Sequence, residues 1–99
     1  MAQQQDVRLQ IQALEQLKIE LETLIKDIEV RGNSYYERVK ALGETGLDVN
    51  VTKKYEEQYW KPDYAMLTQL KQHILTNDIK YIEKCLAVAK TALAGYQGQ

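Results

Sequence analysis

Hydrophobic side chains recur at every seventh position through the first half of this 99-residue chain. The residues of this register are Val7, Leu14, Leu21, Ile28, Tyr35 and Leu42. A second register begins four residues after the first, at Ile11, Lys18, Ile25, Gly32 and Val39. Together they are the d and a positions of a heptad repeat, the pattern by which one helix packs against another. They predict a helix over residues 6–42, with Asp6 as its N-cap and Gly43 just beyond its end.

One alternative concerns the middle of this helix. Gly32 is followed by Ser34 and Glu37, which have the S-x-x-E spacing of a capping box, so a second helix would be able to start there. The hydrophobic phase continues unchanged to Leu42, however, and glycine costs only ~1 kcal/mol inside a helix. The phase therefore favours a single helix with a weak point at Gly32.

The segment after Leu42 predicts a turn and a short helix. Glycines at both ends of Gly43–Gly46 indicate a turn, which we extend as a loop to residue 51. A short helix over residues 52–60 follows, and its apolar stripe is Val51, Tyr55 and Tyr59. The residues suited to cap this helix are Asp48, Asn50 and Thr52.

Proline and glycine delimit the predicted last helix, residues 62–94. Proline disfavours helical geometry at the preceding residue, so we expect a kink or break at Lys61 and Pro62. Gly95 is expected to end the helix, so that residues 95–99 form a tail. At the other end of the chain, we expect residues 1–5 to be a disordered tail. Its registers are Leu67, Ile74, Tyr81 and Val88 at d, Lys71, Asp78, Cys85 and Ala92 at a, and Leu75, Ile82 and Ala89 at e.

The apolar faces are wider than the narrow seam of a two-stranded coiled coil. The first helix widens its face through Leu17 and Leu24, and the last helix does so through Leu75 and Ile82. Such faces are typical of helices with two neighbours each. We therefore predict an all-α fold: an antiparallel helical hairpin with a short extra helix near the turn, dimerising into a four-helix bundle. The expected interface residues are Leu17, Leu24, Tyr55, Tyr59, Leu75 and Ile82.

Charged residues inside the seam leave the register of the hairpin open. Lys18, Lys71 and Asp78 occupy a positions, where a lysine stem can lie on the seam while its ammonium reaches water. If the chain folds back at Pro62, Lys26 comes level with Asp78. If the final helix is continuous from about Thr52, Lys18 comes level with Asp78 instead. The separate stripe of the short helix favours the fold-back at Pro62.

Aromatic residues concentrate near the predicted turn. The chain has no Phe, and most of its aromatic side chains lie in the middle third: Tyr35, Tyr36, Tyr55, Tyr59, Trp60 and Tyr64. We expect Trp60 to pack against Tyr35, Tyr36 or Tyr64 in a small aromatic core. The alternative is that the cluster faces a partner, since tyrosine and tryptophan are favoured at interfaces.

The sequence contains no set of residues that indicates catalysis or a metal. The single His73 and the single Cys85 lie on different faces of one helix, so we expect no enzymatic activity, no metal and no cofactor. A net charge of -1 argues against nucleic acid, and no small-molecule substrate is expected. No apolar run approaches the ~20 residues of a membrane span, and the first residues have no signal-peptide pattern. We expect a cytoplasmic protein, with leaderless secretion as the alternative.

In size and outline the chain resembles small helical proteins associated with bacterial secretion, including helical-hairpin dimers whose turn carries Trp-x-Gly. Here Trp60 is followed by Lys61 and Pro62, and the Tyr-x-x-x-Asp/Glu signal of that family is absent because Cys85 stands four places after Tyr81. We assign no family. We expect a non-enzymatic helical protein–protein interaction module that self-associates or docks on a helical partner. The alternative is a small secreted substrate, or a chaperone or adaptor, of a specialised bacterial secretion system.

Overall fold

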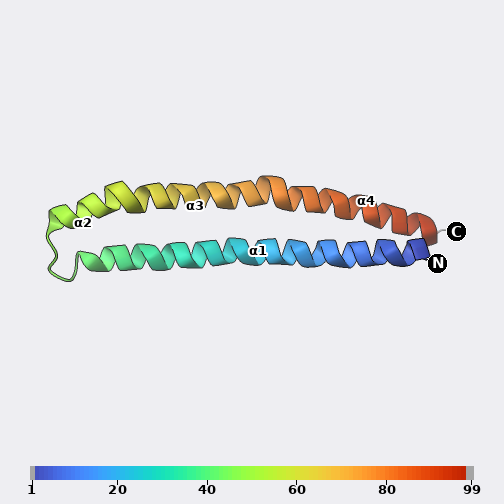
Figure 1. Cartoon of the computed structure of the whole chain (residues 1–99), viewed down its shortest axis with the longest axis horizontal. Helices are drawn as coiled ribbons and strands as arrows, with labels where there is room; N and C mark the ends of the chain where they lie inside the picture. Colours follow the sequence, from blue (N-terminus) through green and yellow to red (C-terminus); the bar gives the residue numbers. More distant parts are fainter. Residues whose placement is uncertain (1, 98–99) are drawn as a thin grey trace. The chain divides into compact units, whose positions relative to one another are not determined.

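The computed structural model describes the backbone of residues 2–97 and the side chains of residues 4–96. These residues form an all-α fold without a β-strand (Figure 1), which confirms the predicted fold class. Its elements are α1 (Ala2–Leu42), α2 (Val49–Tyr55), the π-helical segment η1 (Glu56–Trp60), α3 (Lys61–His73), the π-helical segment η2 (Ile74–Ile79) and α4 (Lys80–Gln97).

The ends of the helices differ from the sequence prediction. α1 begins at Ala2, so Asp6 lies inside the helix and does not cap it. Gly95 lies within α4 and does not have the left-handed φ that would end a helix there. The parts of the predicted tails at Met1 and at residues 98–99 fall outside the described residues.

The chain divides into two compact units. Unit 1 contains residues 1–24 and 73–99, and unit 2 contains residues 25–72. α1 contributes to both units. Unit 2 also holds α2, η1 and nearly all of α3, whereas unit 1 also holds η2 and α4.

Unit 2 is a helical hairpin whose arms are joined by residues 43–48. Three amides of the turn donate hydrogen bonds to the last carbonyls of α1. They run from Gly43 to Lys40 (3.2 Å), from Glu44 to Ala41 (3.0 Å) and from Thr45 to Leu42 (3.3 Å). Gly46 then adopts a φ of +84°, a left-handed conformation that glycine takes without strain. The chain therefore folds back here, and the predicted fold-back at Pro62 is wrong.

The second arm of unit 2 begins three residues earlier than predicted. The Asp48 carboxylate accepts a hydrogen bond of 2.7 Å from the Asn50 amide and so caps a helix that starts at Val49. The arm stays helical through Pro62, where we predicted a kink or break. Proline lacks an amide donor and crowds the carbonyl four residues before it, which here belongs to Gln58. That residue lies in η1, whose irregular hydrogen bonding is the local accommodation of the proline.

η1 also explains why the stripe of the short helix does not continue along the arm. A π-helical segment holds one more residue than the corresponding α-helical turn, so the face that points inward moves by one position. Thr52 and Tyr55 face the hairpin before η1, and Trp60, Asp63 and Leu67 face it afterwards. The helix changes its inward face without breaking.

In unit 1, the first part of α1 packs antiparallel against η2 and α4. The hydrophobic core consists of Ile11, Ile82 and Leu86. Partly buried side chains extend it along both helices; they are Val7, Leu14, Leu21, Ala89 and Leu93. The α1 residues are those of the predicted heptad seam, whereas the α4 residues are not the predicted d and a positions.

The residues of α4 that face α1 differ from the predicted ones because of η2. The π-helical segment again adds one residue, so Ile79, Ile82 and Leu86 face α1 where a continuous heptad would have placed Tyr81 and Cys85. Tyr81 is 68% exposed, although the sequence assigned it to the seam. The predicted d residue Val88 is likewise exposed.

Charged seam residues are paired at the edges of the seam. The Lys18 ammonium lies 3.5 Å from the Glu83 carboxylate in unit 1, and the Lys71 ammonium lies 2.6 Å from the Glu29 carboxylate in unit 2. Both lysines are half-buried, so their stems cover apolar surface while the ammonium groups stay hydrated. Asp78 lies 3.7 Å from His73 on its own helical arm, so the favoured pairing with Lys26 is wrong, and so is the alternative pairing with Lys18.

Deletion of Asn77 tests the role of η2. Removing one residue from the π-helical segment should give a regular α-helix with the same inward face, so the free energy of unfolding should change by less than ~1 kcal/mol. Deletion of Ala87, which is also exposed, is the control. It would move Lys90 and Ala94 onto the seam in place of Ala89 and Leu93 and cost ~2 kcal/mol.

Both deletions are to be measured by chemical denaturation. If both deletions lower the free energy of unfolding equally, η2 does not contain an extra residue that can be removed.

Candidate functional site

The single histidine of the sequence, His73, lies in α3, and the single cysteine, Cys85, lies in α4. His73 is exposed, and its ring lies beside Asn77 and Asp78 on its own helix. Cys85 is half-buried on α4. The described residues contain no group of three or more His, Cys, Asp and Glu side chains placed to hold a metal ion.

A polar cluster joins the two arms of unit 2. The Tyr35 hydroxyl on α1 donates a hydrogen bond of 2.9 Å to Asp63 on α3, and it is hydrogen-bonded to the Tyr55 hydroxyl at 2.9 Å. The hydrogen bond with Tyr55 raises the pKa of Tyr35 above its ordinary value of 10.0, and partial burial and the Asp63 carboxylate act in the same direction. The cluster ties three elements together.

Aromatic stacking continues this cluster on the outer side of the hairpin. Trp60 lies between Tyr36 on α1, with ring centroids 4.9 Å apart, and Tyr64 on α3, with ring centroids 5.3 Å apart. Tyr55 and Tyr59 stack at 5.3 Å. The predicted contact of Trp60 with Tyr35, Tyr36 or Tyr64 is confirmed for Tyr36 and Tyr64, but both tyrosines are exposed, so the cluster is not the small buried core that we expected.

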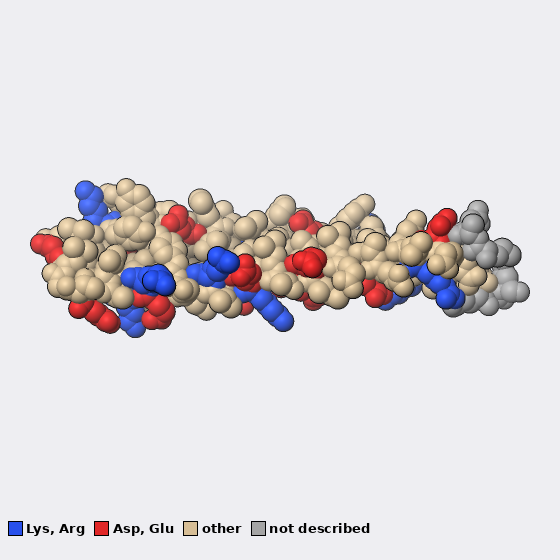
Figure 2. Space-filling model, turned by 60° about the horizontal axis from the view of Figure 1, so that its bottom comes forward, with Lys and Arg blue, Asp and Glu red and all other residues tan. Residues whose placement is uncertain are grey.

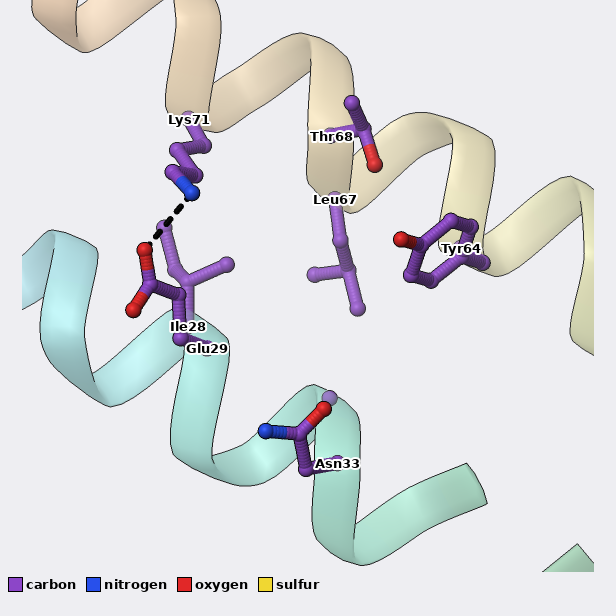
Figure 3. A pocket seen from close by; sticks show the side chains of 8 residues that line it. Ile28, Glu29, Asn33, Tyr64, Leu67, Thr68 and Lys71 are labelled. Carbon is purple, nitrogen blue, oxygen red and sulfur yellow. Dashed lines mark ion pairs between the residues drawn. The ribbon is translucent and has the colours of Figure 1, made fainter.

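A hollow of about 200 Å³ lies between the arms of unit 2. Its lining residues are Ile28, Glu29, Gly32, Asn33, Tyr64, Leu67, Thr68 and Lys71. Figure 3 shows Leu67 and Ile28 pointing into the space between the helices, with the Glu29–Lys71 ion pair beside them. The hollow exists because Gly32 brings no side chain to a seam position. Its two charged groups are already paired with each other, so it has no free charge to hold a ligand.

An apolar groove follows one side of the helix pair in unit 1. Its α1 wall is formed by side chains at d and g positions: Val7, Gln10, Leu14, Leu17 and Leu21. Leu17 is 48% exposed, and it belongs to the row that widens the first helix beyond a coiled-coil seam. The groove therefore lies on the g side of α1.

The α4 wall of the groove is the stripe that η2 turned away from the seam. It contains Tyr81, Cys85, Val88 and Ala92, all of which line the groove. Tyr81 and Val88 are 68% and 66% exposed. Within unit 1, α4 packs only against α1, so Tyr81 and Val88 remain exposed to water. The groove is thus walled by apolar side chains from both helices.

Charged residues flank the groove on opposite sides. Lys84 lines the groove from α4. Glu20 occupies the position of α1 next to Leu17 on the g side and is exposed. Within the described region neither residue forms an ion pair, whereas Lys18 and Glu83 on the other side are paired. Acidic and basic side chains are interspersed on the face drawn in Figure 2.

The residues predicted to form an interface differ in their exposure. Leu17, Leu24, Tyr59 and Leu75 are exposed, and Leu17 lines the groove. Tyr55 is half-buried and bonded to Tyr35. Ile82 is only 5% exposed within the core of unit 1, and it also borders the groove.

Sequence reasoning missed the α4 wall of the groove. Tyr81 and Val88 were assigned to the hairpin seam because they continue the heptad that starts at Leu67. The signal that would have corrected this is the row Ile79, Ile82, Leu86, Ala89 and Leu93, which keeps the three-and-four spacing one residue out of phase.

Among the described residues, no helix is long and apolar enough to cross a membrane. No protein-family model, no curated protein and no solved structure matches this chain.

Tyr35→Phe tests the polar cluster. The variant loses the hydrogen bonds to Asp63 and Tyr55, so the midpoint of thermal unfolding at pH 7 should fall by roughly 5 °C. Because the pKa of Tyr35 is raised in the folded state, the stabilisation is complete below pH 10 and is lost as the pH rises above it. The difference between wild type and variant should therefore shrink above pH 10.

Tyr81→Phe is the matched control, because its hydroxyl is in an exposed residue without a hydrogen bond in the described region. If both variants change the midpoint equally, the cluster does not stabilise unit 2.

Proposed function

We propose that this chain is a non-enzymatic helical interaction module that buries the apolar groove of unit 1 against helices of another subunit. The observation that carries the proposal is the exposed α4 wall. Tyr81 and Val88 are more than half exposed, although they flank a groove that apolar α1 side chains close from the other side. Exposed apolar patches with polar rims are typical of protein interaction sites.

The limited core of the helix pair supports the same proposal. The buried hydrophobic residues of the described region are Ile11, Ile25, Val39, Ile74, Ile79, Ile82 and Leu86. None of the described side chains is fully enclosed. Two antiparallel helices cover only one face of each other, whereas a bundle covers two. Burying the groove would add apolar contact at ~25 cal/mol per Å² of surface removed from water.

The residues of the groove favour binding over chemistry. Its lining is mostly aliphatic and aromatic, and its polar members are a few lysines, amides, a threonine and Asp78. Helix-in-groove recognition needs an apolar surface of this kind with charges at its edges. A reaction would need an activated nucleophile or a pair of acid and base groups, and among the described residues no histidine or lysine is hydrogen-bonded to Cys85.

Val88→Lys tests this proposal against Val30→Lys. The two valines have nearly the same exposure, 66% and 65%, but only Val88 lines the groove. In extracts of the native cells, the wild-type chain should elute from a sizing column in a complex larger than one chain. Val88→Lys should weaken this complex about tenfold or more, because a buried valine contributes ~1.5 kcal/mol or more.

Val30→Lys should leave the complex intact. A wild-type chain that elutes at the mass of one chain, or equal effects of both variants, would contradict the proposal. Circular dichroism checks that both variants remain helical.

A further inference from the structure

We infer that the groove of unit 1 is occupied by a second copy of this chain, related by a twofold axis parallel to the helices, so that α1 of each copy lies against α4 of the other. This inference rests on the proposed function and adds the identity and orientation of the partner. The contact is stabilised by ion pairs between Glu20 of one copy and Lys84 of the other.

The two walls of the groove have equivalent places in their helices. Gln10 and Leu17 are the g positions of α1. After the shift at η2, Cys85 and Ala92 are the g positions of α4. In an antiparallel pair the g positions of both helices lie on the same side, so this side forms one continuous docking face.

The ion pairs within unit 1 fix which residues lie at the same height. Lys18 is level with Glu83, because their charged groups are 3.5 Å apart. Glu20 is two residues further along α1 and is therefore level with about Tyr81 of the antiparallel helix. Lys84 lies about three residues from that level, roughly 4.5 Å along the helix axis. Two long side chains span this offset.

Two twofold arrangements can pack this docking face against the same face of a second copy, and the charges distinguish between them. A twofold axis parallel to the helices preserves height and places α1 opposite the partner's α4, so Glu20 meets Lys84 twice. A twofold axis perpendicular to the helices places α1 opposite the partner's α1 and α4 opposite the partner's α4. It would keep Glu20 and Lys84 on opposite edges of the interface, so neither ion pair would form, which favours the first arrangement.

The available charges also favour a second copy over an unrelated helix. Glu20 stands at the α1 edge of the groove and Lys84 at its α4 edge, and neither has an ion-pair partner in the described region. A surface with opposite charges on its two edges is complementary to itself after the twofold rotation. The pairs Lys18–Glu83 and Glu15–Lys90 lie on the other side and are already made within the chain.

A charge swap tests the arrangement on the purified full-length chain. Light scattering after size exclusion at micromolar concentration should give twice the chain mass. Glu20→Lys and Lys84→Glu should each weaken the dimer roughly tenfold, because each variant replaces two attractions by two repulsions. The double variant should restore the dimer to within about threefold of wild type.

Matched controls use exposed charges that the arrangement leaves apart. Glu22→Lys reverses a charge on the opposite side of α1, and Lys54→Glu reverses one in unit 2; neither should change the mass. A monomer in purified form together with a complex in native extracts would overturn the second copy but leave the proposed function standing. A dimer that both single reversals leave unchanged, or that the double variant fails to restore, would overturn the orientation.

Disulfide trapping provides an independent readout in a Cys85→Ala background. Mixing Glu20→Cys chains with Lys84→Cys chains should give a cross-linked dimer faster than either variant alone. Faster cross-linking within either single variant would indicate that like helices face each other and would overturn the inference.

Discussion

The whole molecule depends on the burial of one apolar seam between antiparallel helical segments. In α1 the seam follows a heptad from Val7 to Leu42 without interruption, so this helix has a fixed inward face. The second chain segment must present its own apolar residues to that face in both units. It does so by changing phase at η1 and at η2, where a π-helical segment absorbs one residue. The inward face of α1 thus keeps one heptad phase, whereas the inward face of the second segment changes phase twice.

The seam accepts polar residues where a partner lies at its edge. Lys18 and Lys71 stand at seam positions, and each reaches a carboxylate on the facing helix. Tyr35 brings a hydroxyl into the seam of unit 2 and satisfies it with Asp63 and Tyr55. No buried polar side-chain atom of the described region is left without a hydrogen bond. Such paired groups limit how far the helices can slide, because sliding would leave a half-buried charge or hydroxyl unpaired.

Much of the fold follows from the sequence, because a heptad repeat reports directly on helix packing. The registers of Val7 and Ile11 gave the inward face of α1, and Trp60 packs on two of the three tyrosines that we named. Pro62 misled the prediction, since a π-helical turn can accommodate proline without ending the helix. The same kind of turn at η2 moved Tyr81 and Val88 out of the seam. Period counting assumes a constant number of residues per turn, so it cannot locate a site that depends on a change in that number.

Gly32 has a consequence for how the molecule moves. A methyl group at this position would meet only the Leu67 side chain, at 3.6 Å, so close packing does not demand glycine there. The residue instead leaves a hollow beside the seam and lowers the intrinsic stability of the helix by ~1 kcal/mol relative to alanine. Local opening of a helix starts where intrinsic stability and packing are both lowest. Amide hydrogens around Gly32 should therefore exchange with solvent before those around Val39, which makes the middle of unit 2 the place where the interior of α1 first opens.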